Sequence, residues 1–273
     1  MEEPDVWDKT GRTKKYVIQL LRGCDMSSIE RNRLRTSDLI THCTNRRATG
    51  AGGTTNYHDI AYLRSVMKKP NIAANYQIFE EAVPVFSDMG LIGKSHKRTR
   101  RLTSQELDRL RSGLLKRESF RPNGNTCISF TDILEFSILT CMRIGEVCSI
   151  RWQDQDNKTV TVRNRKDPCK KTGNHMLVPL LGESFDIAMN QPHKAECIFL
   201  YNSRSVTAGF QRVQNELGIH DLRYHDLRRE RASRLFEKGY SIEELAQVTD
   251  NKNLNILWQV YAHLFPNKLH EKG

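Results

Sequence analysis

Four residues have the types and the order in the chain that handling a phosphodiester requires: Arg143, His225, Arg228 and Tyr261. Arg143 follows a nearly continuous apolar run, residues 128–142, which predicts a buried helix, and an unpaired buried charge is very costly. His225 and Arg228 are separated by two residues and therefore share one face of a helix. The two guanidiniums would bind an anionic phosphate, and Tyr261 would supply a nucleophile beside it.

Transfer of a phosphodiester to a tyrosine oxygen needs a nucleophile, a proton donor for the leaving 5′ oxygen, and fixed positive charge around the transition state. The unperturbed pKa of tyrosine is about 10, so forming the phenolate at pH 7 costs about 4 kcal/mol. Two guanidiniums on one phosphate can supply this stabilisation, because Arg–phosphate contacts are bidentate and charge-assisted. We therefore assign Arg143 and Arg228 to the nonbridging oxygens. His225 would contact the phosphate or relay a proton to or from Tyr261.

Glu146 and His225 each allow a second interpretation. The carboxylate of Glu146, one helical turn after Arg143, would orient that guanidinium, but it could also be a surface acid paired with Arg151. His225 could be a helix-capping or core histidine. Arg228 on the same helical face favours the phosphate contact.

Tyr261 also fits two patterns. The apolar residues of the segment 254–261 have the i, i+3, i+4, i+7 spacing of a buried helical stripe, so periodicity taken alone favours a core residue. Tyr224 and Tyr240 are competing candidates for the nucleophile. They flank the helix of His225, however, and would be poorly placed to reach the phosphate from a separate segment.

The order of these motifs is typical of one enzyme family. An R-I-G-E sequence begins at Arg143, an H-D-L-R sequence begins at His225, and a Y-A-H sequence begins at Tyr261. At these residues the chain resembles the tyrosine recombinases, the phage integrase family, in which R-x-G-E, H-x-x-R and a C-terminal tyrosine follow in this order. The similarity extends over roughly residues 100–265, including segments that resemble the opening of the family's catalytic domain and its β-hairpin. This arrangement favours Tyr261 as the nucleophile.

The resemblance also implies a proton donor on the β-hairpin. In the family the leaving 5′ oxygen receives its proton from a lysine there, and Lys166 occupies that place in this chain. Lys170 and Lys171 lie in the same turn, and we expect them to contact the DNA backbone.

One position departs from the family pattern. Members usually carry a histidine or a tryptophan shortly before the tyrosine, where this chain has Asn251, or Lys252 if the register shifts by one residue. An asparagine amide can donate a hydrogen bond to a phosphate oxygen, but it carries no charge and transfers no proton at neutral pH. We therefore expect Asn251 in the site and a weakened activity.

Hydrophobic periodicity predicts a mainly α fold with a small antiparallel β-sheet. Residues 1–12 are expected to be a flexible N-terminus. Residues 13–90 are expected to form a helical domain, which the resemblance identifies as a SAM-like core-binding domain that clamps DNA. A basic linker, residues 91–103, would lead to the tyrosine-recombinase catalytic domain, residues 104–273.

Local signals place the elements within these domains. A breaker-rich turn over residues 46–54 precedes a helix that Thr54 or Thr55 would cap. Two strands are predicted on either side of the lysine-rich turn, at residues 159–163 and 176–179. Further helices are predicted at residues 16–21, from 36 and from 104 onward, and at 72–89, 128–142, 183–190, 205–217, 224–239, 241–249 and 253–263.

The charge of the chain favours a polyanionic partner. The net charge is +11 and the pI is about 9.4. Five basic residues, which we expect to contact DNA, gather in the linker: Lys94, Lys97, Arg98, Arg100 and Arg101. The alternative for this cluster is a solvated linker.

The cysteines and the hydropathy exclude other classes of protein. The seven cysteines form no C-x-x-C pair and no spacing suited to zinc, so they indicate reduced thiols in the cytoplasm. The sequence shows no signal peptide and no run of 18 apolar residues, so we expect neither secretion nor a membrane span.

Together the motifs predict a site-specific DNA recombinase or integrase that works through a 3′-phosphotyrosyl intermediate, with no metal and no cofactor. Its partners would be double-stranded DNA at specific recombination sites and further copies of the chain, as a dimer or tetramer on DNA. Only a short segment precedes the first predicted helix, so we do not expect the arm-binding module of many integrases in this chain. The alternatives are a catalytically weakened DNA-binding relative and a type IB topoisomerase-like nicking enzyme.

Overall fold

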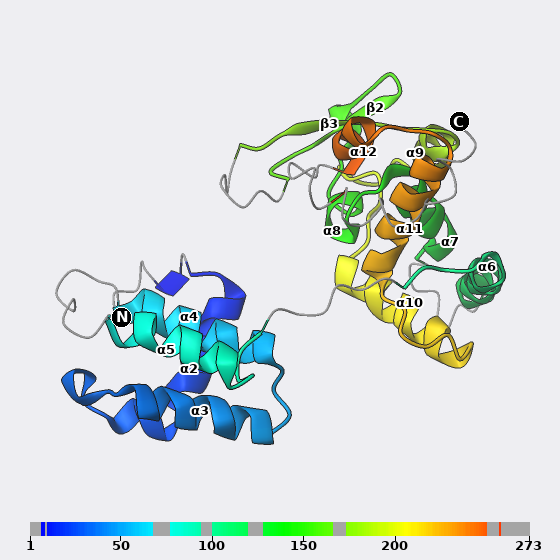
Figure 1. Cartoon of the computed structure of the whole chain (residues 1–273). Coiled ribbons are helices and arrows are strands. Elements are labelled where there is room, and N and C mark those ends of the chain that lie inside the picture. The colour runs from blue at the N-terminus through cyan, green and yellow to red at the C-terminus, as the bar shows by residue number, and fades with distance from the viewer. Residues whose placement is uncertain are drawn as a thin grey trace, which may run out of the picture. The chain divides into compact units, whose positions relative to one another are not determined.

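The computed structural model describes residues 7–8, 10–67, 77–93, 100–119, 128–165, 173–249 and 257. The chain divides into two compact units, Met1–Arg98 and Thr99–Gly273 (Figure 1). The division falls inside the range expected for the linker. The described elements are mainly helices with one antiparallel sheet, so the predicted fold class is confirmed.

The N-terminal unit is helical. Its elements are α2 (Arg12–Arg22), η1 (Asp25–Ser28), η2 (Arg31–Arg33), α3 (Thr36–Ala48), α4 (Gly53–Met67) and α5 (Gln77–Asp88). Its core consists of apolar side chains of α3, α4 and α5, among which Leu39, Cys43 and Phe79 are fully buried. The buried amide of Asn56 on α4 donates to the carbonyl oxygens of Cys43 and Leu91, 2.9 and 3.0 Å away, and so ties α4 to its neighbours.

The predicted cap of α4 is wrong. The helix begins at Gly53, so Thr54 and Thr55 lie in its first turn rather than before it. The cause is tertiary packing. A Cβ atom at Gly53 would lie 2.9 Å from the backbone nitrogen of Gly93, and the Thr54 hydroxyl donates to the Gly93 carbonyl 3.0 Å away.

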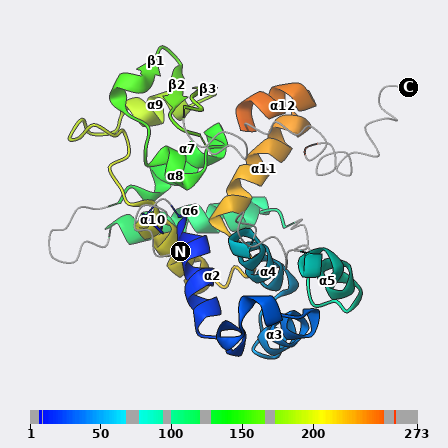
Figure 2. The same ribbon diagram turned by 90° about the vertical axis from the view of Figure 1, so that its left-hand side faces the viewer.

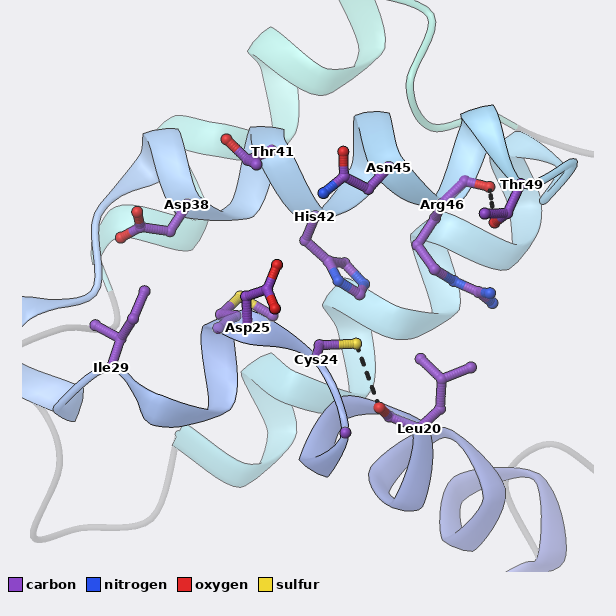
Figure 3. A pocket seen from close by; sticks show the side chains of 12 residues that line it. Leu20, Cys24, Asp25, Ile29, Asp38, Thr41, His42, Asn45, Arg46 and Thr49 are labelled. Atoms are coloured by element: carbon purple, nitrogen blue, oxygen red, sulfur yellow. Dashed lines mark hydrogen bonds between the residues drawn. The ribbon is translucent and has the colours of Figure 1, made fainter.

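A pocket of about 520 Å³ lies between α2, η1 and α3 of this unit. His42 and Arg46 extend from α3 toward the segment that carries Leu20 and Cys24 (Figure 3). The two side chains share the buried carboxylate of Asp59, whose Oδ2 lies 2.9 Å from Arg46 Nε and 3.4 Å from His42 Nε2. This shared carboxylate joins α3 to α4 inside the unit.

In the C-terminal unit, other helices pack around one buried helix, α7 (Phe130–Thr140). The helices of this unit are α6 (Ser104–Ser119), α7, α8 (Ile144–Val147), η5 (Trp152–Asp154), α9 (Ser184–Met189), α10 (Ser203–Glu216), α11 (Tyr224–Glu237) and α12 (Ile242–Thr249). Helix α7 packs against α6, α9, α10 and α11, and Ile133, Leu134 and Phe136 along it are almost inaccessible to solvent. The closeness of α10 depends on Gly209, where a Cβ atom would lie 2.3 Å from the Phe130 ring.

The sheet contains three antiparallel strands in the order β1-β2-β3. Strands β2 (Thr159–Val162) and β3 (Met176–Pro179) are the two predicted strands, and Val160 pairs with Val178. The third strand, β1 (Gln155–Asp156), was not predicted, because two polar residues give no alternating pattern. Helix α12 contacts both strand β3 and helix α11. Figure 1 and Figure 2 show α12 beside the end of α11.

Several of the predicted elements lie partly outside the residues that the structure describes. Of the helix expected at 72–89, the structure describes Gln77–Asp88, and of the helix expected at 253–263 it describes the helical Leu257. The expected flexible segment 1–12 is likewise largely outside the described residues. Among the described residues, no helix is long and apolar enough to cross a membrane.

Candidate active site

The end of α7 aims Arg143 out of the core. Helix α7 stops at Thr140, and Cys141 takes a left-handed conformation with φ of 55°. This conformation, uncommon in a non-glycine residue, turns the chain so that Arg143 immediately precedes α8. The hydroxyl of Thr140 accepts a 3.4 Å hydrogen bond from Met142 N within this turn.

Glu146 contacts Arg143 through both of its carboxylate oxygens. Oε1 lies 2.6 Å from Arg143 Nη1, and Oε2 accepts a 3.0 Å hydrogen bond from the backbone N–H of Arg143. The alternative partner, Arg151, forms an ion pair with Glu196 instead. The Glu146 side chain is 10% exposed and that of Arg143 is 32% exposed, so the acid is buried behind a guanidinium that reaches solvent.

Helix α11 positions both His225 and Arg228. Its first residue, Tyr224, is buried, and its hydroxyl lies 2.7 Å from Ser137 Oγ of α7. Tyr224 also lines the cavity described below, but burial raises the pKa of its hydroxyl, which disfavours the phenolate that a nucleophile needs. One turn later, the buried guanidinium of Arg228 donates to the carbonyl oxygens of Cys141 and Thr249. Arg228 therefore joins α11 to the ends of α7 and α12.

Arg143, His225 and Arg228 line one cavity of about 460 Å³. Residues from α7, α8 and α10 complete its wall, among them Ser137, Ile144, Thr207, Phe210, Gln211 and Gln214. The imidazole of His225 is exposed to solvent at this cavity, whereas the Arg228 side chain is almost wholly buried. The fold thus brings together three residues that the sequence predicted would share one site.

The cavity carries an excess of positive charge. Burial, followed by the charges of Arg143 and Arg165, lowers the pKa of Arg228 to about 10, so it remains a cation at pH 7. Burial also lowers the pKa of His225, and the charges of Arg228 and Arg143 lower it further. The imidazole is exposed, but the surrounding protein still removes part of its hydration. At neutral pH the site therefore combines arginine cations with a neutral histidine.

The remaining predicted catalytic residues, Lys166, Asn251 and Tyr261, lie outside the described residues. The same holds for five predicted DNA contacts: Lys94, Lys97, Arg98, Lys170 and Lys171. Within the described chain, no group of three or more His, Cys, Asp or Glu side chains could hold a metal ion.

Arg100 and Arg101, the two described residues of the basic cluster, bind carboxylates of their own unit. Arg100 forms an ion pair with Glu106 on α6. Arg101 Nε lies 3.2 Å from Oε2 of Glu230, and Arg101 Nη1 lies 2.7 Å from Oε1 of Glu237, both on α11. Their expected contact with DNA stays a prediction, and these ion pairs give both side chains a structural partner.

One buried cation, Arg165, was missed by the sequence analysis. Val160 and Val162 point into the core, and strict alternation would place residue 164 there as well. Asn164 instead has φ of 47°, which shifts the alternation by one residue. Arg165 is consequently 1% exposed, and its Nη2 lies 3.3 Å from Oε2 of Glu146. The asparagine, a residue that tolerates positive φ, was the available signal.

Comparison with known proteins assigns the chain to a family. A model of the phage integrase family matches residues 96–268. The shufflon-specific DNA recombinase of Escherichia coli is 30% identical over 172 residues, which are 62% of this chain and 41% of that protein. The chain spans about two fifths of the length of the curated relatives it matches.

Solved structures show the same fold. A lambda integrase dimer bound to a COC′ core site has a TM-score of 0.68 at 18% identity, over 93% of this chain and 71% of that one. A Tn1549 transposon integrase in complex with a circular intermediate DNA has a TM-score of 0.70 at 15% identity, over 97% and 94% of the two chains. Because the family model covers more than half of its residues, the chain belongs to the phage integrase family.

Proposed function

We propose that this protein is a site-specific DNA recombinase that cleaves and rejoins DNA strands through a 3′-phosphotyrosyl intermediate. The observation that carries the proposal is the single cavity lined by Arg143, His225 and Arg228. Such a cavity provides fixed cations for a phosphate and a neutral imidazole beside them. The match to the phage integrase family supports the same conclusion.

The two arginines would bind the nonbridging oxygens of the scissile phosphate. A guanidinium has five N–H donors, and Arg228 uses two of its groups on backbone carbonyls, which fixes its orientation and leaves other donors for the anion. Negative charge on these oxygens increases in the transition state. Preorganised donors therefore stabilise the transition state more than the ground state.

The covalent step would transfer the phosphate from the 5′ oxygen to the oxygen of Tyr261. The bond between that oxygen and phosphorus forms, the bond to the 5′ oxygen breaks, and Lys166 gives the leaving oxygen its proton. Neutral His225 would accept the tyrosine proton or donate to the phosphate. The phosphotyrosyl bond keeps the energy of the phosphodiester, so a 5′ hydroxyl of a second strand can reverse the step without a nucleotide cofactor.

Recombination would need several copies of the chain on double-stranded DNA. Two duplexes exchange strands, so we propose that copies of the chain assemble on each recombination site. The N-terminal unit would be the core-binding domain of each copy. The lambda integrase of known structure is a dimer on its core site. The described cysteines are all unpaired, which agrees with a reducing compartment such as the cytoplasm.

Capture of covalent adducts tests the proposal without knowledge of the target site. The protein is incubated with a pool of nicked duplexes of random sequence around the nick, and DNA bound covalently is recovered under denaturing conditions and sequenced. We expect an enriched sequence and a phosphotyrosine linkage. Tyr261→Phe should abolish the adduct, whereas Tyr240→Phe, which removes a partly exposed hydroxyl, should retain it.

Two further outcomes would select the alternatives. Sequence-specific binding without any adduct would indicate a DNA-binding relative that has lost catalysis. An adduct that supports relaxation of supercoiled DNA, but no exchange between two copies of the enriched site, would indicate a topoisomerase-like nicking enzyme.

A further inference from the structure

Arg165 is a cation without access to water. It is 1% exposed and is the largest fully buried side chain among the described residues. Burying an ion in the protein interior is unfavourable unless its partners compensate for the lost hydration. A basic residue in a hairpin that was expected to face DNA therefore has a role inside the protein.

The partners of Arg165 fix it at both its side chain and its backbone. Nη2 lies 3.3 Å from Oε2 of Glu146, and Nη1 lies 3.0 Å from Sδ of Met176 on β3. The backbone N–H of Arg165 donates to the carbonyl of Asn174 over 2.8 Å, and the Asn174 amide donates back to the Arg165 carbonyl over 2.9 Å. The residue is thus held across the hairpin and against the active site at the same time.

Glu146 is the link between Arg165 and Arg143. One carboxylate oxygen accepts from the Arg143 side chain, and the other faces both the Arg143 backbone and Arg165. Burial opposes ionisation of Glu146, but the charge of Arg165, followed by the hydrogen bonds of Arg143, holds its pKa below the usual value. The carboxylate is therefore ionised at neutral pH and bridges two arginines.

We propose that Arg165, the residue directly before Lys166 in the sequence, is a positioning residue for DNA cleavage that is held against the carboxylate that orients Arg143. Lys166, the proton donor of the proposed function, follows Arg165 in the sequence, so we expect the contacts of Arg165 and Arg143 with Glu146 to restrict where the proton donor lies relative to the phosphate-binding guanidinium. This inference rests on the proposed recombinase function. A purely structural role, in which Arg165 only neutralises Glu146, is the competing explanation.

A sulfur substrate separates these explanations. In the step concerned, the phosphorus bond to the 5′ oxygen breaks and that oxygen takes a proton from Lys166. When sulfur replaces this bridging oxygen, the leaving group is a thiolate, whose conjugate acid has a pKa of about 8.5, so it needs no proton. A variant with a misplaced proton donor should therefore be slow on the oxygen substrate alone.

The experiment measures adduct formation by the full chain on matched nicked duplexes with 5′-bridging oxygen or sulfur. For Arg165→Met we expect a loss of about 10- to 100-fold on oxygen and less than about threefold on sulfur, with Lys166→Ala showing the same pattern. Arg163→Met is the matched control, because Arg163 lies on the same segment and pairs with Asp154 away from the cavity. It should change neither rate.

A second variant addresses loss of folding. Arg165→Lys keeps the charge but not the planar fork, so the neutralisation explanation predicts full activity, whereas the positioning role predicts a selective loss on oxygen. Equal losses on oxygen and sulfur in a folded variant, or no loss on either, would overturn the proposal. If the wild-type protein forms no adduct on either substrate, the recombinase function itself fails.

Discussion

The carboxylate of Glu146 restricts Arg143 from two sides, since it binds the backbone N–H and the guanidinium of the same residue. Arg228 is restricted in the same way by two carbonyl oxygens. Neither guanidinium therefore has to lose much rotational freedom when a phosphate binds. This preorganisation is what a site needs in order to stabilise charge that develops during the reaction.

The titration of His225 provides a test at this site. Burial and the nearby arginines lower its pKa, so the folded protein binds a proton less readily than the unfolded chain. Stability from this residue is present above the unfolded pKa of about 6.5 and is lost as the pH falls through the folded value. By NMR, we expect the His225 imidazole to titrate below 6.5 in the free protein and at higher pH when a phosphodiester is bound.

The corresponding unfolding experiment compares the wild type with His225→Asn in urea at pH 7.5 and 5.5. The wild type should lose more stability than the variant at the lower pH. Because solvent screens an exposed imidazole, we expect a difference below about 1 kcal/mol. A His225 titration above 6.5 in the free protein would contradict the assignment of a neutral imidazole.

Asn251 should respond to replacement by histidine. If it lies where the family carries a histidine or tryptophan, its amide donates to a nonbridging oxygen without adding charge. A partly charged donor interacts more strongly with the transition state, so Asn251→His should speed adduct formation about tenfold, with little change in DNA affinity. Lys252→His is the control and should give no gain. A gain at Lys252 alone would show that the register is wrong by one residue.

Helix α11 carries the functional side chains on one part of its surface and is anchored along the rest. Its start is tied to α7 through Tyr224, and its middle is tied to α7 and α12 through Arg228. The buried carboxylate of Glu230 binds Arg101 and Arg234. The position of α11 therefore depends partly on Arg101, a residue of the expected linker that belongs to the C-terminal unit.

Arg101 should consequently affect stability more than DNA binding. Arg101→Gln removes one of two cations from the buried Glu230, and we expect the free energy of unfolding to fall by about 1–2 kcal/mol. Lys97→Gln combined with Arg98→Gln should instead flatten the dependence of DNA affinity on salt, because fewer counterions are released. Urea unfolding and binding titrations at several salt concentrations measure the two effects. A flattened slope in Arg101→Gln with unchanged stability would show that Arg101 contacts DNA.

On the scale of the whole chain, each unit has its own apolar core. The N-terminal core includes Leu39, Phe79 and Phe86, and the C-terminal core is built around Ile133 and Phe136. The described residues of the N-terminal cluster all lie between Leu34 and Ile92, and those of the two C-terminal clusters all lie from Leu102 onward. Each unit therefore has what it needs to fold separately.

A fragment of residues 99–273 should show this independence. We expect it to unfold cooperatively, with the helical circular dichroism signal of a folded domain, and to retain adduct formation on a nicked duplex at high protein concentration. Its DNA affinity should be about 100-fold lower or more, because two linked binding modules reinforce each other. If the fragment is unfolded while the full chain is stable, the two units depend on each other.

The order of the motifs and the type of most elements could be predicted from the sequence. Helical periodicity and a β-forming pattern are local properties, so α7, α11, β2 and β3 were predicted close to their observed positions. The same local spacing placed His225 and Arg228 on one helical face. Residue chemistry then indicated a phosphate site.

The partners of the charged residues required the tertiary structure. Arg101 donates a hydrogen bond to Glu230, 129 residues further along the chain, and Arg228 donates to the carbonyl of Cys141, 87 residues before it. No local sequence pattern could reveal either contact. The burial of Arg165 depends on a single positive φ at Asn164, and the start of α4 depends on packing against Gly93. Sequence patterns indicate which residues can share one face of a helix or strand. Long-range packing determines which charged side chains are buried, and a buried charge is costly unless another group pairs with it.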